Sequence, residues 1–274
     1  MSISFGLVIV GDEILSGKRA DKHMPKVIEL LGARGLQLAY ADYVGDDPAR
    51  ITAVLARAFA AARNSGDVVF SCGGIGATPD DHTRQCAAAA LDVELALHPE
   101  AERLIRERMQ DIAKEQGVPY EPDRHDNIHR LNMGMFPVGA AIIPNPYNKI
   151  PGFRVQAGAG AVHFVPGFPV MAWPMVEAVL DTHYAHLHQK SAWTEKSVIV
   201  MGSMEAALTP LMLAIEAGHS GVKVFSLPSV DHPDYGRHIE LGVKGAPEAV
   251  NAAFPALLAG LHAFNAKLGP ELVR

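Results

Sequence analysis

Segments typical of strands and helices alternate over the first quarter of the chain. The strand segments are short apolar runs, and the segments between them carry apolar residues at helical spacing. In chain order they are a strand over 5–10, a helix over 21–34, a strand over 36–44, a helix over 48–63 and a strand over 67–72. This alternation predicts an α/β fold in which a parallel sheet is covered by helices on both faces and ligands bind beyond the carboxyl ends of the strands.

The rest of the chain is expected to divide into two parts. We expect helices over 81–91, 99–116, 123–133 and 168–183, and short strands over 140–143, 153–156 and 162–165. The stretch from Gln189 to Glu195 is polar and aperiodic, so we place a boundary there, between a domain over 1–188 and a small domain over 193–274. The small domain is predicted to be β-α-β-β-α, with strands over 197–201, 222–227 and 238–243 and helices over 205–217 and 247–264.

Composition narrows the class of protein. The net charge of −6 argues against a general affinity for nucleic acid or an anionic membrane. Two cysteines, Cys72 and Cys86, cannot form a disulfide framework, and no apolar run reaches the roughly 18 residues of a spanning helix. The N-terminus lacks the pattern of a signal peptide, so we expect a cytoplasmic protein in which both cysteines are small buried residues.

The segment from Val68 to Asp81 joins an apolar run to three glycines, a proline and two adjacent aspartates. A buried strand that ends in a Gly-rich turn before a helix presents several backbone N–H groups to one anion-sized spot. We therefore expect Gly73, Gly74 and Gly76 to cradle a phosphate. Their spacing differs from the dinucleotide fingerprint and from the Walker loop, which argues against a dehydrogenase and a P-loop enzyme.

The two aspartates of this segment need a separate explanation. Asp80 and Asp81 would repel a phosphate unless a divalent cation lies between them or they bind ribose hydroxyls. A carboxylate at this place can also cap the following helix. Since capping takes only one aspartate, we expect one of the pair to cap the helix and the other to contact a metal, a ribose or an activated water.

A second acidic loop, Gly11-Asp12-Glu13-Ile14-Leu15-Ser16-Gly17, also follows a strand and precedes a helix. The two loops should open at the same edge of a parallel sheet and converge there. Taken alone, Glu13 is as typical of a solvated loop charge as of a ligand contact, and Ser16 and Asp21 are as typical of turns or caps as of functional groups. Convergence of the loops favours a functional Glu13.

Two turn-rich loops lie beside the later strands, from Asn145 to Gly152 and over Pro166-Gly167-Phe168-Pro169. Plain turn chemistry explains them equally well. As functional segments, Pro166-Gly167 offers free N–H groups before a helix, and Lys149 is a nearby cation that suits a phosphate. The amides of Asn145 and Asn148 suit a heterocycle.

Histidines and a glycine pair suggest metal or nucleic-acid sites only weakly. His125 and His129 lie four apart, as zinc ligands on one helix face do, but no third ligand has matching spacing. We expect surface or helix-end roles for them and for the histidines at 183, 186 and 188. Gly218-His219-Ser220-Gly221 has the spacing of the nucleotide-clamping loop of KH modules, but it precedes a strand, so we expect a turn that ends a helix.

The chain resembles the molybdopterin-binding MoaB/Mog-type fold, and most closely the N-terminal domain of the CinA (competence/damage-inducible protein A) family. Five motifs in the same order carry the resemblance, which covers nearly the whole chain. Gly11-Asp12-Glu13-Ile14-Leu15 resembles the family's Gly-Thr-Glu-Leu-Leu, Val44-Gly45-Asp46 its Val-Gly-Asp, and Gly73 to Asp81 its Gly-Gly-Leu-Gly-Pro-Thr-x-Asp-Asp. Asn145 to Gly152 is similar to a loop that ends in Pro-Gly, and Pro166 to Pro169 is similar to Pro-Gly-x-Pro.

This resemblance implies a Rossmann-like three-layer α/β/α domain, often oligomeric, that binds a molybdopterin- or nucleotide-type ligand. CinA-like members are associated with hydrolysis of the ADP-ribose pyrophosphate bond using a divalent cation, and Mog-type relatives with adenylylation of molybdopterin. The tail is similar to the small KH-like domain that follows in CinA proteins. The amidohydrolase domain of longer members has no counterpart here, so deamidation of nicotinamide mononucleotide is not expected.

Three positions depart from the family pattern. Asp12 stands where the family has threonine, Ala77 where it has proline, and Tyr147-Asn148-Lys149-Ile150 where it has Gly-Thr-Ala. The last change brings larger side chains to a loop of small residues and affects the size of the pocket and the choice of substrate. Asp12 adds a carboxylate, which either strengthens a metal site or weakens anion binding.

These inferences combine into one leading hypothesis, a metal-dependent nucleotide pyrophosphatase. Asp80, Asp81 and Glu13 are the expected catalytic residues and ligands of Mg²⁺, Mn²⁺ or Co²⁺, with Glu13 binding the metal or activating water. The ligand is expected to contact Gly11, Asp12, Gly73, Gly74, Gly76, Thr78, Asn145, Lys149, Pro151, Gly152, Pro166 and Gly167. The alternatives are a non-catalytic pterin- or nucleotide-binding module and an enzyme that adenylylates molybdopterin. In each case the partner is a small phosphate-containing molecule, and the protein is expected to be a homo-oligomer.

Overall fold

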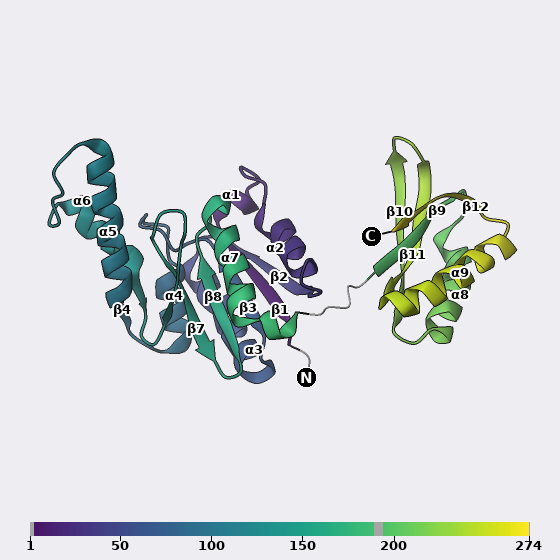
Figure 1. The fold of residues 1–274 in the computed structure, drawn as a ribbon, viewed down its shortest axis with the longest axis horizontal. Helices are drawn as coiled ribbons and strands as arrows, with labels where there is room; N and C mark the ends of the chain where they lie inside the picture. The colour runs from purple at the N-terminus through teal and green to yellow at the C-terminus, as the bar shows by residue number, and fades with distance from the viewer. Residues whose placement is uncertain (1–2, 189–193, 274) are drawn as a thin grey trace. The chain divides into compact units, whose positions relative to one another are not determined.

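The computed structural model describes residues 3–188 and 194–273. The chain forms two compact units, Met1–His188 and Gln189–Arg274, and each is described by itself (Figure 1). The boundary predicted between Gln189 and Glu195 falls mainly on residues 189–193, which lie outside the described residues. No described helix is both long enough and apolar enough to cross a membrane.

A six-stranded sheet forms the centre of the first unit. Its strand order is β2-β1-β3-β8-β7-β6; β2, β1, β3 and β8 are parallel, and β7 runs antiparallel to both of its neighbours. The strands are β1 (Phe5–Val10), β2 (Leu38–Val44), β3 (Val68–Cys72), β6 (Ala141–Ile143), β7 (Gly152–Ala157) and β8 (Gly160–Val165). Every residue of β1, β3 and β8 is buried, which is typical of a sheet covered on both faces. The predicted, mostly parallel sheet is confirmed.

Helices cover both faces of this sheet, so the first unit has three layers. Alternate residues of β1 point to opposite faces: Leu7 belongs to one hydrophobic core and Val8 to the other. The core around Val8 includes residues of α3 (Pro48–Ser65) and α4 (Thr83–Leu91), and the core around Leu7 includes residues of α2 (His23–Gly32) and α7 (Pro169–His183). Cys72 and Cys86 are buried as free thiols, one in each core, as predicted.

An excursion between α4 and β6 extends away from the sheet (Figure 1). It contains β4 (Leu95–Leu97), α5 (Pro99–Gln116), α6 (His125–Arg130), a 3₁₀ turn (Leu131–Gly134) and β5 (Met135–Pro137). Strands β4 and β5 pair with each other, and each is too short to show a period in the sequence. The single helix predicted over 123–133 is wrong in its second half, because α6 ends at Arg130 and the chain continues as the 3₁₀ turn. In this turn Gly134 packs closely on α5.

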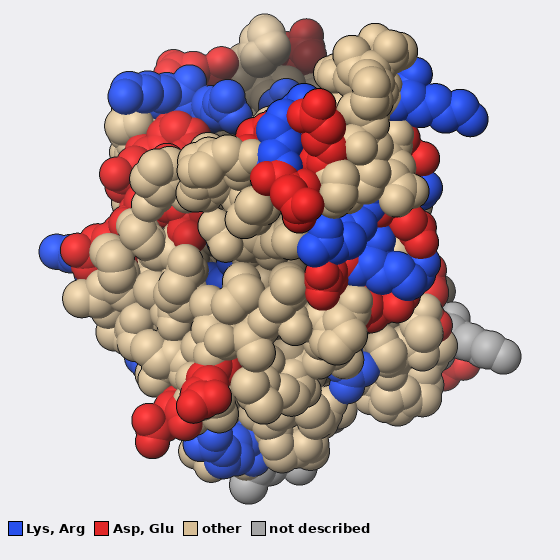
Figure 2. All heavy atoms as spheres, turned by 90° about the vertical axis from the view of Figure 1, so that its left-hand side faces the viewer, with Lys and Arg blue, Asp and Glu red and all other residues tan. Residues whose placement is uncertain are grey.

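The charges of α5 are paired along the helix. Arg103, Arg106 and Arg108 each form an ion pair with a glutamate of the same helix. Figure 2 shows the side of the molecule that lies at the left in Figure 1. On it, basic side chains lie next to acidic ones, and uncharged surface lies between these charged groups. The arginines of α5 therefore do not form a stripe of unpaired positive charge.

The second unit is a small α+β domain with a four-stranded antiparallel sheet in the order β10-β11-β9-β12. Its elements are β9 (Thr194–Met201), α8 (Glu205–Gly218), β10 (Val222–His232), β11 (Gly236–Gly245), α9 (Pro247–Ala263) and β12 (Lys267–Val273). The predicted β-α-β-β-α order is present, and β12 adds a strand that the sequence did not predict. The pair Gly269-Pro270 argues against a strand in the sequence, because proline in a sheet is tolerated only at an edge or a bulge. Strand β12 meets this condition, since it is an edge strand with a register shift between Leu268 and Glu271. The likeness to a KH domain stays a prediction.

Candidate functional site

A cavity of about 730 Å³ opens at the carboxyl ends of β1, β3 and β8. The loops after these strands form most of its wall, together with residues 145–151. Its lining consists of Val10, Gly11, Glu13, Lys18, Arg19, Asp46, Gly73, Gly74, Ile75, Gly76, Ala77, Thr78, Asp80, Asp81, Met133, Asn145, Asn148, Ile150, Pro151, Pro166, Gly167, Phe168 and Met171. The two acidic loops therefore meet in one pocket, as predicted from the parallel order of their strands.

The glycine loop, residues 73–78, carries a row of unused backbone donors. Its first carbonyls bind α4: the Gly73 carbonyl accepts from the Thr83 hydroxyl (3.1 Å), and the Gly74 carbonyl accepts from the Thr83 N–H (2.9 Å). The N–H groups of residues 74–77 have no hydrogen-bond acceptor within 3–188 or 194–273. Consecutive free N–H groups in a turn before a helix are the usual means of binding an anion.

Two glycines of this loop are required by the close approach of α4 and of Asp81. Gly74 has a φ of +68°, and a Cβ there would collide with the Thr83 hydroxyl. A Cβ at Gly76 would lie 2.5 Å from Oδ2 of Asp81. Glycine at these two positions therefore lets the loop pack closely against Thr83 and Asp81. This packing explains the two glycines independently of any room they leave for a ligand.

Arg84 supports the other half of the glycine loop from beneath. Its Nη1 donates to the carbonyl of Ile75 and to the carbonyl of Gly76 (2.5 Å), and the residue is only 3% exposed. Burial lowers the pKa of Arg84 to about 10, against the opposing charge of Asp81. Sequence reasoning missed this residue. Its signal was a single arginine in an otherwise small and polar first turn of the helix that follows the loop.

Asp81 braces the glycine loop and does not cap a helix. Its Oδ2 accepts from the N–H (2.8 Å) and from the hydroxyl (2.5 Å) of Thr78. Helix α4 begins at Thr83, later than predicted, and the residue before it, His82, makes no side-chain capping bond. The expectation that one aspartate caps this helix is therefore wrong, because the helix starts too late for either side chain to reach its first turn. Hydrogen bonding to the Thr78 side chain lowers the pKa of the exposed Asp80 carboxyl.

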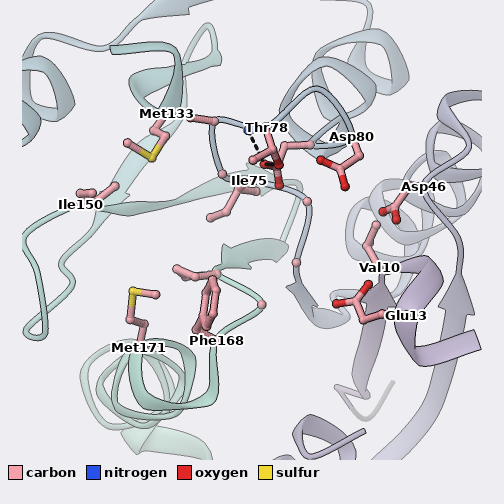
Figure 3. Close-up of a pocket in the computed structure, with 18 of the residues that line it drawn as sticks. Val10, Glu13, Asp46, Ile75, Thr78, Asp80, Met133, Ile150, Phe168 and Met171 are labelled. Carbon is pink, nitrogen blue, oxygen red and sulfur yellow. Dashed lines mark hydrogen bonds between the residues drawn. The ribbon is translucent and has the colours of Figure 1, made fainter. Parts of the chain in front are cut away.

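Asp46, on the loop after β2, completes an acidic side of the pocket with Glu13 and Asp80 (Figure 3). Burial raises the pKa of Asp46. The charges of Asp12, Glu13 and Asp80 act in the same direction, so each of these carboxylates is close enough to repel that of Asp46. Asp46 was recognised as part of a family motif but not as a residue of the site, because the sequence does not show in which direction the side chain of a loop aspartate points.

Asp12 lies outside the pocket lining, so its expected contact with the ligand is not supported. It forms bonds to the neighbouring loop instead: the Asp12 N–H donates to Oδ2 of Asp46 (2.9 Å), and the Asp46 N–H donates to Oδ1 of Asp12 (3.2 Å). A Cβ at Gly45 would collide with the Asp12 carboxylate. Asp12 therefore joins the first two loops of the site. Asp21, for which the sequence left a cap and a functional role equally open, lies just before α2, and its carboxylate accepts from the N–H groups of His23 and Met24 in the first turn of that helix.

An apolar wall faces the acidic side across the glycine loop. Met133, Ile150, Phe168 and Met171 form it, and Figure 3 shows them grouped opposite Glu13 and Asp46. Phe168 is 57% exposed and lines the same cavity as the other three side chains, and a grouping of apolar residues at a surface cavity is typical of a ligand site. Sequence reasoning missed this wall because its four residues come from three separate segments.

The loop over 145–152 differs from prediction in the roles of its two asparagines, of Lys149 and of Gly152. The Asn145 amide donates to Oδ1 of Asn148 (2.8 Å) and to the Ile150 carbonyl (2.9 Å), while Asn148 bonds to Met171 Sδ (3.3 Å). Both amides line the pocket, but they are used to shape the loop, which leaves them poorly placed to recognise a heterocycle. Lys149 pairs with Asp111 of α5 (2.6 Å) outside the lining, so its expected contact with a phosphate is not supported.

Gly152 is also absent from the lining, because it begins β7 and is buried against the Phe164 carbonyl. Pro151 does line the pocket, as predicted.

The cations of the pocket are Lys18 and Arg19, which follow α1 (Asp12–Leu15). Both are exposed, and neither forms an ion pair with any residue that the structure describes. Gly167 lines the opposite side, where its carbonyl accepts from Nε2 of the buried His23 (2.9 Å). His23 thereby holds the Pro166-Gly167 turn, a contact between distant segments that no pattern in the sequence predicts.

Comparison with known proteins identifies the domain. The profile of the family described as "probable molybdopterin binding domain" matches residues 6–186. The chain belongs to this family. A CinA-like protein of Anaeromyxobacter dehalogenans (strain 2CP-C) is 34% identical over 164 residues, which are 60% of this chain and 37% of that protein. The chain thus spans little more than a third of that relative.

Two further matches extend the comparison. A protein of Pyrobaculum arsenaticum is 30% identical over 210 residues, 75% of this chain and 72% of that protein. The crystal structure of CinA from Thermoplasma acidophilum, a protein of unknown function, matches with a TM-score of 0.53 and 25% identity, over 65% of this chain and 97% of that chain. The resemblance to the CinA N-terminal, MoaB/Mog-type domain is therefore confirmed.

The pocket of this molybdopterin-binding domain offers oxygen ligands to a cation. Within the described residues, no three His, Cys, Asp or Glu side chains are grouped so as to hold a metal ion by themselves. Glu13, Asp80 and Asp81 nevertheless all line the cavity, as predicted. Mg²⁺ commonly takes one or two carboxylates and completes its octahedron with water and phosphate oxygens. The carboxylates present fit such a partial site.

Proposed function

We propose that the first unit binds a phosphate-containing pterin- or nucleotide-type ligand and, with a divalent cation, hydrolyses a nucleotide pyrophosphate such as ADP-ribose. One observation carries the proposal: the free N–H groups of residues 74–77 lie between an acidic side and an apolar wall of the same cavity. A ligand that suits all three has a flat ring, a phosphate group in the middle and a distal part that tolerates carboxylates.

Each part of the pocket suits one part of such a ligand. Phe168 and Met171 present apolar surface to a ring, and the glycine loop presents N–H donors to a phosphate. A cavity of about 730 Å³ is within the usual range for a cofactor-sized molecule. Lys18 and Arg19 add two basic side chains to the lining, and they suit a second phosphate.

The acidic side supports the hydrolytic part of the proposal. The Asp80 carboxylate is exposed in the lining and its pKa is lowered, which suits a ligand of Mg²⁺, Mn²⁺ or Co²⁺. Glu13 then either shares the cation or holds a water for attack on phosphorus. The cation would supply charge to offset the negative charge that develops on the phosphate oxygens.

The test is an assay of purified protein with ADP-ribose. Product analysis should detect AMP and ribose 5-phosphate with Mg²⁺, Mn²⁺ or Co²⁺ and none with EDTA. Asp80→Asn should abolish turnover. An unchanged ADP-ribose peak with all three metals would refute hydrolysis of this substrate.

A non-catalytic binding module is the second candidate, and one observation favours it. No group of three metal-binding side chains occurs within 3–188 or 194–273, whereas the donors and the apolar wall need no metal. In that case Asp80→Asn leaves ligand affinity unchanged or improves it, because a repelling charge is removed. Incubation with ATP and molybdopterin tests the third alternative, adenylylation, by the appearance of adenylylated pterin.

A further inference from the structure

We propose that Arg84 is a positioning residue that aims the N–H groups of the glycine loop at the ligand's phosphate. The inference rests on the proposed function, since it concerns how that pocket binds phosphate. Arg84 is itself absent from the lining and acts from the far side of the loop. Its Nη1 donates to the Ile75 carbonyl and to the Gly76 carbonyl.

The planarity of the peptide bond links these contacts to the pocket. In a trans peptide the C=O and the following N–H point in opposite directions. The Ile75 carbonyl shares its peptide with the Gly76 N–H, and the Gly76 carbonyl shares its peptide with the Ala77 N–H. Holding the two carbonyls from beneath therefore turns these two N–H groups away from Arg84, and both residues line the cavity.

Thr83 does the same for the preceding half of the loop. Its hydroxyl and N–H hold the carbonyls of Gly73 and Gly74, which orients the N–H groups of Gly74 and Ile75. All four carbonyls of residues 73–76 are thus bound by two consecutive residues of α4. The four N–H groups of the same peptides, residues 74–77, are the unused ones.

Burial of a charged side chain at this place suggests that more than loop stability is involved. Arg84 is 3% exposed, and its Nε is buried without a hydrogen-bond partner in the described part of the chain. The neighbouring carboxylate, Asp81, is occupied by Thr78. A buried cation with so little compensation is costly, whereas an anion on the opposite side of the loop would offset its charge.

The experiment compares AMP with adenosine as probes, by calorimetry on the full chain. We expect Arg84→Lys, which keeps the charge but loses the forked donor, and Arg84→Ala to weaken AMP binding by about 10-fold or more. Adenosine, which lacks phosphate, should bind the variants as it binds the wild type. Added ethylguanidinium should restore AMP affinity to Arg84→Ala, because it can occupy the vacated site.

Arg34→Ala is the matched control. Arg34 also binds a backbone carbonyl, that of Leu30 (2.8 Å), and pairs with Asp181, but it lies outside the pocket lining. The Arg34→Ala variant should have a lower melting temperature than the wild type and an unchanged affinity for AMP. If Arg84→Lys is folded and binds AMP as the wild type does, or if AMP and adenosine weaken equally, the proposal is wrong.

A second measurement separates this inference from the proposed hydrolysis. In an amide NMR spectrum of the wild type, inorganic phosphate should shift the signals of residues 74–77, and Arg84→Lys should reduce those shifts. Phosphate-dependent shifts without ADP-ribose cleavage would overturn the hydrolase proposal and support the role of Arg84. Cleavage that Arg84→Lys leaves with an unchanged KM would overturn the role of Arg84 alone. No shift in the wild type would overturn both.

Discussion

Asp12 and Asp46 exchange hydrogen bonds, each carboxylate accepting from the backbone N–H of the other at 2.9 and 3.2 Å. The exchange joins the loop after β1 to the loop after β2, and it holds two negative charges near each other at the rim of the pocket. The bond from the Asp12 N–H favours the ionised form of Asp46, whereas burial and charge repulsion raise the pKa of Asp46. A nearby cation would remove this conflict.

The raised pKa of Asp46 predicts a pH-dependent stability with a definite sign. The folded state favours the protonated carboxyl, so the stabilising contribution is complete at low pH and is lost as pH rises through the raised pKa. Asp46→Asn should therefore melt at a higher temperature than the wild type at pH 7, and at the same temperature below about pH 4. Scanning calorimetry across that range tests this, with the exposed Glu94→Gln as a control for net charge. A lower melting temperature for Asp46→Asn at pH 7 would contradict the prediction.

Asp80→Asn and Asp81→Asn should have different effects on stability and on turnover. Asp81 accepts two bonds from Thr78, so Asp81→Asn should lower the free energy of unfolding by about 1 kcal/mol, as charge-assisted bonds become neutral ones. Asp80→Asn should lower the free energy of unfolding less than Asp81→Asn does, since Asp80 is exposed, and it should reduce metal-dependent turnover by at least ~100-fold. Urea denaturation and steady-state kinetics measure the two effects. A loss of stability in Asp80→Asn and none in Asp81→Asn would reverse the assignment.

Lys18 and Arg19 should govern affinity for a phosphorylated ligand. Each lines the pocket, so Lys18→Gln and Arg19→Gln should each weaken binding roughly 10-fold, more at low salt than at high salt, with kcat little changed. Lys149→Gln is the control, because Lys149 pairs with Asp111 and is outside the lining. Calorimetric titration with ADP-ribose compares the three. Loss of affinity in Lys149→Gln alone would favour the role that sequence reasoning gave it.

His163 predicts sensitivity to acid in the core of the first unit. It is fully buried, stacks on Phe70 at 5.3 Å and shares a hydrogen bond with the Tyr184 hydroxyl at 2.7 Å. Burial lowers the pKa of His163 to about 3. The unfolded chain takes up the proton first as pH falls, so stability is complete above about pH 6.5 and declines below it by up to about 1.4 kcal/mol per pH unit.

A glutamine at position 163 tests this origin of the acid sensitivity. His163→Gln should be less stable than the wild type at pH 7 but should lose less stability between pH 6.5 and 4. Urea denaturation at several pH values measures both effects, and the exposed His186→Gln is the control. Equal pH slopes for His163→Gln and the wild type would show that another group is responsible.

The sequence predicted the first unit well because its strands are buried on both faces and its helices are amphipathic. Helix α5 has the predicted bounds, and α3 is two residues longer than expected. The strands that were missed are β4, β5 and β12, whose shortness or proline removes the local signal. Their pairing partners are distant in the chain, so only the tertiary structure identifies them as strands.

Prediction of the site succeeded where backbone pattern decides position and failed where side-chain direction does. The glycine loop, Glu13 and Pro166-Gly167 could be placed because parallel strands end at one edge. Lys149, Asp12 and Asp46 could not, since a loop side chain takes whichever partner lies nearest. Arg84 was missed because a buried arginine in a helix looks, in the sequence, the same as an exposed one. The homo-oligomer stays a prediction.

The order of the strands has a consequence for how the protein acquires its pocket. β3 pairs with β8, about ninety residues later in the chain, and the turn after β8 supplies the side of the cavity that faces the glycine loop. Neither the first three strands nor the excursion after them can therefore make the pocket during synthesis. Occupancy of the pocket would report that the whole first unit has folded, so a fluorescent ligand could serve as a sensor of complete folding on the ribosome.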